Sequence, residues 1–194
     1  MSYRINITPD TDTLYLILPG ASQGAHAPLL KAITDKLETA GKTWLAVTYP
    51  FQDKGLNSPE SESHEREMQE VLDGLSLLPF SQYEMIVIIG KSFGALVGAK
   101  LVSELKKRYR CTIEFHVLGF IFDAHMRSLP DKCESLTVYQ GEYDRFGSAA
   151  EVAKIFPTAA VFTIVGGDHS YRNANREPVF EDVVVRKLFE VVKI

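Results

Sequence analysis

The segment IIGKSFG, residues 88–94, matches two motifs that give the same serine different chemistry. As the end of a phosphate-binding loop, GKS would place the Ser92 hydroxyl on a magnesium ion. As G-x-S-x-G, the same residues would form a nucleophile elbow, in which the hydroxyl attacks a carbonyl carbon. The residues on either side of Ser92 therefore decide which chemistry fits.

A phosphate-binding loop does not fit the residues before Ser92. The motif G-x-x-x-x-G-K-[ST] needs a glycine five positions before its second glycine, so that backbone N–H groups can wrap the phosphates. The residue at that distance before Gly90 is Met85. Residues 85–89, MIVII, also form an unbroken apolar run that predicts a strand leading directly into Gly90, with no loop to hold a phosphate.

A nucleophile elbow fits both flanks of Ser92. It requires a strand that ends abruptly, a serine in a tight turn and a helix that starts at once. The predicted strand is 85–89, the predicted helix is 93–109, and glycines stand two residues before and after the serine, where backbone must pass close by. Lys91, inside the motif, is expected to face away along the turn and to be solvated rather than catalytic. The helix begins with small residues that would let it lie close to the sheet: Ala95, Gly98 and Ala99.

A serine hydroxyl becomes a good nucleophile when a histidine accepts its proton and a carboxylate orients that histidine. The candidates are His26, His64, His116, His125 and His169. We predict His169 as the base, because it follows the last apolar run and the two glycines of VGGDHSY let its loop place the imidazole over the end of the sheet. The histidines at 64, in a polar loop, and at 116, within a strand, are predicted to be solvated or structural. Those at 26 and 125 follow strand ends, but their surroundings do not suggest a base.

The predicted acid is Asp144, in YQGEYDRFG, which follows the apolar run at 136–139 and lies between the serine and the histidine in the chain. Asp123, after the preceding run, is the alternative. Asp168 is adjacent to His169, so its side chain should point elsewhere and cap the loop. Glu142 is close enough in sequence to be confused with Asp144.

The elements that would position these residues alternate between apolar runs and longer segments of helical period. Predicted strands are 14–18, 44–49, 85–89, 115–122, 136–139 and 160–165, with residues 3–7 as a candidate edge strand. Predicted helices are 27–40, 62–78, 93–109, 148–155 and 178–192. Most of the runs are apolar throughout, which is typical of strands covered on both faces. The predicted fold class is α/β, a mainly parallel sheet of about six strands with helices on both faces and reactive groups at the carboxyl ends of the strands. Residues 50–65, rich in Pro, Ser and charge, are predicted to be a surface loop, with a lid or substrate rim as the alternative.

Length and composition predict a single globular domain, residues 1–194, and exclude several function classes. The 45% apolar and 24% charged fractions are those of an ordinary soluble protein, and a net charge of −4 does not favour nucleic-acid binding. No apolar run approaches the roughly 18 residues needed to span a membrane, and the N-terminus lacks a secretory signal. Two isolated cysteines, Cys111 and Cys133, give no disulfide framework, so we expect a cytoplasmic location. No cluster has metal-ligand spacing, and no metal or cofactor is expected.

The order Ser92, Asp144, His169, with GKSFG, GEYDRFG and GGDHSY at successive strand ends, closely resembles the α/β-hydrolase superfamily. The resemblance extends from LYLILPG to the C-terminal helix, and it looks most like the short, lidless branch that includes dienelactone-hydrolase-like proteins and small carboxylesterases. It implies an α/β-hydrolase fold without a cap domain. It also implies that Ser92 is the nucleophile, Asp144 the orienting acid and His169 the general base.

The resemblance further implies an oxyanion hole made of two backbone N–H groups. One belongs to Phe93, the residue after the nucleophile, and the other to the loop LPGASQGAH after the first core strand. By matching position, the second donor is Ala21, with Ser22 as the alternative. The usual His-Gly of this loop appears here as Pro19-Gly20. Dienelactone hydrolases proper use a cysteine nucleophile where this chain has a serine, so their substrate is not transferred.

These residues predict a serine hydrolase that cleaves an ester-type bond of a small-molecule or acyl substrate through an acyl-enzyme. Thioesterases, peptidases and acyltransferases use the same triad, because the pocket walls choose the leaving group and the acceptor. A binding protein that retained the hydrolase fold without catalysis is the non-enzymatic alternative.

Overall fold

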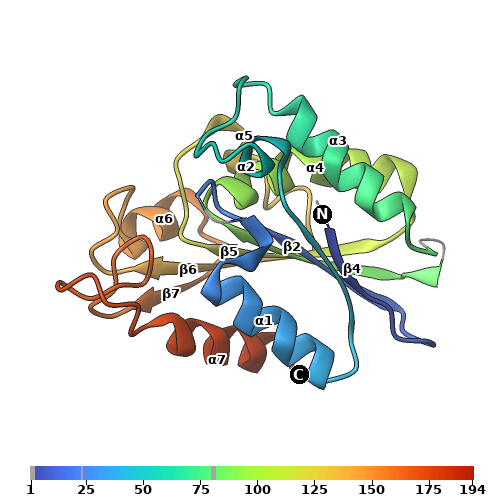
Figure 1. Cartoon of the computed structure of the whole chain (residues 1–194). Coiled ribbons are helices and arrows are strands. Elements are labelled where there is room, and N and C mark those ends of the chain that lie inside the picture. Colours follow the sequence, from blue (N-terminus) through green and yellow to red (C-terminus); the bar gives the residue numbers. More distant parts are fainter. Residues whose placement is uncertain (1–2, 23, 80–81) are drawn as a thin grey trace.

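The computed structural model describes residues 3–22, 24–79 and 82–194, and its strands form one seven-stranded sheet with helices on both faces (Figure 1). The strands are β1 (Tyr3–Asn6), β2 (Thr13–Leu18), β3 (Thr43–Val47), β4 (Met85–Lys91), β5 (Thr112–Leu118), β6 (Ser135–Gly141) and β7 (Ala160–Ile164). Their order across the sheet is β1-β3-β2-β4-β5-β6-β7, and every neighbouring pair is parallel except β1 with β3. The predicted α/β class and the mainly parallel sheet are therefore confirmed. The candidate edge strand at the N-terminus is β1, which raises the predicted six strands to seven.

The helices divide between the two faces of the sheet. One face is covered by α1 (Pro28–Thr39) and α7 (Glu181–Val192), which contact each other. The other carries α3 (Glu65–Ser76), α4 (Phe93–Arg108) and α6 (Ala149–Ile155) (Figure 1). Short helical turns complete the connections: η1 (Gly24–His26), α2 (Pro50–Asp53) and α5 (Ala124–Arg127). Both faces are thus apolar, which explains why the central strands are hydrophobic throughout rather than alternating.

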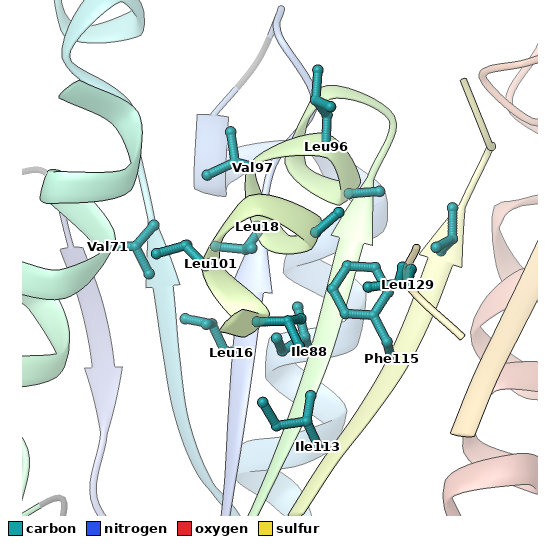
Figure 2. Packing of buried hydrophobic residues seen from close by; sticks show 14 of the residues in the cluster. Leu16, Leu18, Val71, Ile88, Leu96, Val97, Leu101, Ile113, Phe115 and Leu129 are labelled. Atoms are coloured by element: carbon teal, nitrogen blue, oxygen red, sulfur yellow. The ribbon is translucent and has the colours of Figure 1, made fainter. Parts of the chain in front are cut away.

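Helix α4, which follows Ser92, has most of its residues buried. Its Leu96, Val97 and Leu101 pack against residues of β2, β4, β5 and α3 (Figure 2). The three predicted small residues of its first turns are all buried, and a Cβ at Gly98 would lie 2.7 Å from the Phe115 ring. The helix therefore lies against the sheet as the small residues predicted, and its N-terminus is fixed at the end of β4.

Several predicted boundaries differ from those of the structure, and two of the differences concern segments near the candidate site. The loop expected over 50–65 begins with the helical turn α2, which proline can start because its missing N–H has no helical partner to lose. The strand expected over 115–122 ends at Leu118, because Gly119 adopts φ +72° and the chain leaves the sheet there. Both differences lie at the edge of the sheet where the candidate site is found.

The sheet has a topological switch point between β2 and β4. After β2 the chain continues into α1 on one face of the sheet and then into β3, which lies on one side of β2. After β4 it continues into α4 on the opposite face and then into β5, which lies on the other side of β4. Leu18 at the end of β2 pairs with Gly90 near the end of β4. The loops after these two strands therefore diverge, which opens a crevice at the carboxyl edge of the sheet, the usual place of ligand binding in open α/β sheets.

Candidate active site

Ser92 occupies a strained turn between β4 and α4. Its backbone has φ 49° and ψ −112°, outside the regions that a non-glycine residue usually adopts. Such a conformation costs of order 1–3 kcal/mol and persists where the surrounding structure over-determines it. Here the Ser92 N–H donates to the Leu118 carbonyl at 3.0 Å, which ties the turn to the end of β5. The predicted strand, turn and helix of the elbow are all present.

The two glycines of the motif are required by close contacts of the backbone. A Cβ at Gly90 would lie 2.6 Å from the Cα of Ala95, in the first turn of α4. A Cβ at Gly94 would lie 2.2 Å from the Leu18 carbonyl oxygen. Neither contact can be relieved by moving a flexible side chain, so both positions exclude every side chain larger than hydrogen.

Ser92, His169 and Asp144 form one hydrogen-bonded chain. The His169 Nε2 is 2.8 Å from the Ser92 Oγ, and its Nδ1 is 2.7 Å from the Asp144 Oδ2. The second carboxylate oxygen of Asp144 accepts the Phe146 N–H at 2.9 Å. The carboxylate is fully buried, whereas the imidazole keeps 15% of its side-chain surface exposed. Three residues predicted from separate strand ends are thus brought together in the order acid, imidazole, hydroxyl.

The environment of His169 favours the neutral imidazole. Burial lowers the pKa of His169 below its usual value, because it penalises the charged form. The hydrogen bond that His169 makes with the Asp144 carboxylate raises the pKa of His169, whereas the positive charge of Lys91 lowers it further. A neutral imidazole with one nitrogen held by a carboxylate can accept a proton at the other, which is what a general base requires.

The alternative acids and bases lie in other roles. Asp123 caps α5 by accepting the His125 N–H at 2.7 Å. Asp168 caps its own loop, as predicted, by accepting the backbone N–H groups of Ser170 and Arg172 at 2.7 and 2.9 Å. Glu142 accepts the Gly166 N–H at 2.8 Å.

The other histidines do not join this chain of hydrogen bonds. His116 is buried in β5, where burial lowers its pKa to about 4, and the Nδ1 of His64 is 2.8 Å from the Lys100 Nζ. His26 and His125 are exposed, in η1 and α5 respectively.

A glutamine positions the predicted second oxyanion donor. The Gln52 Nε2 donates to the carbonyl oxygens of Gly20 and Ala21 at 2.7 and 3.1 Å, and its Oε1 accepts the Tyr49 N–H at 2.9 Å. In a trans peptide the C=O and the N–H point in opposite directions. The Gly20 carbonyl and the Ala21 N–H belong to one peptide, so the Ala21 N–H points away from Gln52. Gln52 also binds the Ala21 carbonyl, so the Ser22 N–H of the next peptide points away from Gln52 as well. Gly20 lies beside Ser92, since a Cβ on it would be 3.9 Å from the Ser92 Cβ.

The first predicted donor, the Phe93 N–H, stands at the N-terminus of α4. Backbone N–H groups in the first turn of a helix have no intrahelical acceptor, and together with the helix dipole they favour a negative charge. The Phe93 ring is enclosed by the rings of Tyr49, Phe51 and His64, with centroids 5.4, 5.7 and 5.0 Å away. This packing fixes the start of the helix beside the serine.

The expectation that Lys91 is solvated was wrong. Its Nζ donates to the His169 carbonyl oxygen at 2.7 Å and lies 5.2 Å from the centroid of the Tyr171 ring. Burial lowers the pKa of Lys91 to about 8, although Asp144, Asp168 and Glu181 counteract this. Lys91 therefore turns toward the loop that carries His169 and contacts it through its ammonium.

Above Ser92 lies a hollow of about 340 Å³. Ala27, Pro28, Leu29 and Leu30, from the start of α1, line an apolar part of it. Polar and charged lining comes from His169, Lys91, Arg145, Arg172 and Glu181. A bound carbonyl group in this hollow would have access to the hydroxyl, the imidazole and the Ala21 peptide.

The comparisons with known proteins agree with this geometry. A family model described as an alpha/beta hydrolase domain matches residues 11–193. The chain belongs to the alpha/beta hydrolase family. Among curated proteins, no sequence matches this chain significantly.

Solved structures share the fold of this alpha/beta hydrolase at low sequence identity. A protein of unknown function from Agrobacterium tumefaciens aligns with a TM-score of 0.74 and 17% identity, over 98% of this chain and 89% of its own. A serine hydrolase homologue from Coxiella burnetii aligns at 0.69 and 17%, over 96% and 90%. The esterase Est1E from Butyrivibrio proteoclasticus, solved with ferulic acid bound, aligns at 0.66 and 15%, over 99% and 95%.

Sequence reasoning missed two residues of this hydrolase site. Gln52 falls in a polar stretch where no periodicity indicates structure, although Pro50 followed by a short polar run is a signal for a helical turn. Lys91 was misplaced because lysines are seldom buried, and its surroundings come from Gly119 and Tyr171, far away in the sequence.

In the part of the chain that the structure describes, no helix is both long and apolar enough to cross a bilayer.

Proposed function

We propose that this alpha/beta hydrolase is a serine hydrolase that cleaves an ester-type bond through an acyl-enzyme. The observation that carries the proposal is the hydrogen-bonded chain from Asp144 through His169 to Ser92, with the serine at the strained turn of an elbow. Neither feature is needed for folding alone, since the turn costs free energy and the carboxylate is buried.

In the first half-reaction, the Ser92 Oγ attacks the substrate carbonyl carbon while His169 Nε2 accepts the hydroxyl proton. Asp144 holds the imidazole in the required tautomer and stabilises the imidazolium that forms. The tetrahedral intermediate then collapses as His169 gives the proton to the leaving oxygen. The leaving alcohol departs, and the acyl group remains on Ser92.

In the second half-reaction, water takes the place of the alcohol. His169 accepts a proton from the water as it attacks the acyl carbon, and the bond to the Ser92 Oγ breaks. Transfer of the proton back to Oγ releases the acid and restores the hydroxyl. Proton transfer through one positioned imidazole typically accelerates such reactions by about 10²–10⁴-fold.

The developing oxyanion would be bound by the N–H groups of Phe93 and Ala21. The Phe93 N–H is supported by its place at the N-terminus of α4. The Ala21 N–H is supported by Gln52, which binds the Gly20 carbonyl of the same peptide and the carbonyl of Ala21. Removing one such donor typically costs about 10²–10³-fold in kcat. Because these donors are backbone groups, their strength depends on residues that orient them rather than on their own side chains.

A panel of p-nitrophenyl esters and matched acyl thioesters of increasing chain length tests this proposal. We expect ester hydrolysis by the intact protein and its loss in both Ser92→Ala and His169→Gln, with unchanged thermal unfolding. Turnover of thioesters but not esters would reassign the bond that is cleaved. Equal turnover by the intact protein and Ser92→Ala would contradict the role of the serine, and complete inactivity of the intact protein would favour a binding protein.

A further inference from the structure

A second hollow, of about 370 Å³, adjoins the first on the far side of His169. It is lined by Arg145, Arg172 and Arg176, which we name the arginine face. The rest of its lining comes from Tyr143, Asp168, His169 and Ser170. Arg145, His169, Ser170 and Arg172 also line the hollow above Ser92, so the two hollows adjoin at the histidine. Three guanidinium groups thus border the candidate active site of a chain whose net charge is −4.

Among the described residues, the guanidinium groups of the arginine face form no ion pair with a carboxylate. Each of the three lies more than 4 Å from every carboxylate that the structure describes, whereas Arg66 and Arg108 elsewhere both pair with glutamates.

The nearby carboxylates are engaged in other contacts. Asp168 accepts two backbone N–H groups, and Glu177 accepts the Asn173 side-chain amide at 2.6 Å. Burial raises the pKa of Glu181, although the positive charge of Arg172 acts to lower it.

The loop that presents two of these arginines is braced. Tyr171 and Arg176 adopt φ 59° and 63°, conformations that non-glycine residues rarely take. Tyr171 is anchored by its hydroxyl, which donates to the Tyr139 carbonyl at 2.7 Å.

Arg176 is held by the neighbouring Asn173, whose carbonyl accepts the Arg176 N–H at 2.8 Å and whose Oδ1 accepts the Asn175 and Glu177 N–H groups. These bonds hold the backbone of the loop from which the two arginines project. Strain of this kind is concentrated at ligand-binding sites.

The position of His169 indicates which part of a substrate would reach the arginine face. In acyl transfer, the histidine that accepts the serine proton gives it to the leaving group, so the leaving group lies next to the imidazole. The hollow at the arginine face contains His169 but not Ser92 or Ala21, which line the first hollow. The acyl group would therefore occupy the first hollow, and the leaving group would extend past the imidazole into the second.

We propose that the leaving group of the natural substrate carries an anionic carboxylate or phosphate that binds the arginine face. This inference rests on the proposed function, because it needs a leaving group that His169 protonates. Guanidinium groups bind both anions through paired N–H···O bonds, which are stronger and more directional than neutral hydrogen bonds. Arg145, whose guanidinium lies 4.7 Å from the centroid of the Phe146 ring, and Arg172 are the two arginines that line both hollows.

Acetate esters that differ in one group test the proposal. The anionic esters are 4-acetoxybenzoate and 4-acetoxyphenyl phosphate, and their neutral partners are 4-acetoxybenzamide and the dimethyl ester of the phosphate. We expect kcat/KM to be about tenfold or more higher for each anionic ester, since charge-assisted hydrogen bonds are about twice as strong as neutral ones. This preference should shrink in high salt, because the arginine face is open to solvent. The ratio between the two anionic esters identifies whether carboxylate or phosphate is the better ligand.

Arg172→Gln and Arg176→Gln, singly and together, assign the effect to the arginine face. We expect the double variant to lose most of the preference for anionic esters, measured as the ratio of kcat/KM for each anionic ester to kcat/KM for its neutral partner in the same variant. Arg110→Gln removes the same charge beyond the C-terminus of α4, at the opposite edge of the sheet, and serves as the matched control. It should leave both activities unchanged.

Two results would overturn the inference while leaving the proposed function intact. One is equal hydrolysis of anionic and neutral esters by the intact protein. The other is a preference for anions that survives when Arg145, Arg172 and Arg176 are all replaced by glutamine, which would place the anion elsewhere. If none of the esters is hydrolysed and Ser92 is not acylated, the proposed function itself fails, and the inference fails with it.

Discussion

At the scale of single residues, the account depends on the protonation state of His169. Burial lowers the pKa of this histidine, so its neutral form is retained to a lower pH than in an exposed histidine. The base is active only when neutral, and activity should therefore fall on the acid side as the pH drops through this lowered pKa. We predict an acid limb of kcat/KM with its midpoint below about 6.5, the ordinary value for histidine. A pH–rate profile with a p-nitrophenyl ester measures it, and a midpoint above that value would contradict the assigned environment.

Lys91 makes a second prediction at this scale. Its ammonium disfavours a second positive charge on His169, and its bond to the His169 carbonyl holds the loop. Lys91→Met should therefore raise the pKa of His169 and move the acid limb of the profile to higher pH. Lys107→Met, which removes an exposed charge from the last turn of α4, is the control and should leave the profile unchanged. An unshifted limb in Lys91→Met would mean that the lysine only fills space.

The residues of the triad were predictable, but their supports were not. Ser92, Asp144 and His169 each follow a strand end that apolar runs reveal, and a parallel sheet brings such ends to one edge. From the sequence, Asp123 remained an alternative for the acid. It caps α5 instead, in a short turn that no sequence pattern indicated. The buried position of Lys91 depends on tertiary contacts, which override the general preference of lysine for solvent.

At the scale of elements, the elbow and the short helix α2 act together. α4 brings the Phe93 N–H to the site, and α2 brings the glutamine that orients the peptide after β2. The fold class, the mainly parallel sheet and the elbow followed from periodicity and glycine spacing. α2 did not, because four helical residues are too few to show a period.

We predict that Gln52→Glu lowers kcat by up to about 10²-fold with little change in KM, since it removes the donor to Gly20 and Ala21 and so loosens an oxyanion donor that acts in the transition state. Glutamate has nearly the same shape as glutamine, but its ionised carboxylate cannot donate. The matched control is Gln69→Glu on the exposed face of α3, where the glutamine amide donates to Asp73. A KM effect without a kcat effect would show that Gln52 shapes the pocket instead of the oxyanion hole.

At the scale of the whole molecule, the sheet separates the candidate nucleophile Ser92 from the two thiols. The free cysteines Cys111 and Cys133 precede β5 and β6, at the amino edge, whereas Ser92 follows β4 at the carboxyl edge. Burial raises the pKa of both thiols, that of Cys133 to about 11, which keeps them unreactive. The chain thus has the overall fold of its hydrolase relatives with a serine as the only candidate nucleophile that the described residues place beside His169.

We predict that alkylation with N-ethylmaleimide leaves esterase activity intact. The activity is measured before and after treatment, and mass spectrometry counts the modified thiols. Loss of activity in proportion to thiol modification would implicate a cysteine in the chemistry.

The central claim is that Ser92 is a nucleophile activated by His169 and Asp144. A fluorophosphonate probe tests it most directly, because phosphonylation requires an activated serine and leaves a covalent adduct that needs no knowledge of the substrate. We predict one adduct, found by peptide mass spectrometry on Ser92, strongly slowed in His169→Gln and absent in Ser92→Ala. A folded protein that takes up no probe, or one that is labelled equally after Ser92→Ala, would contradict the account.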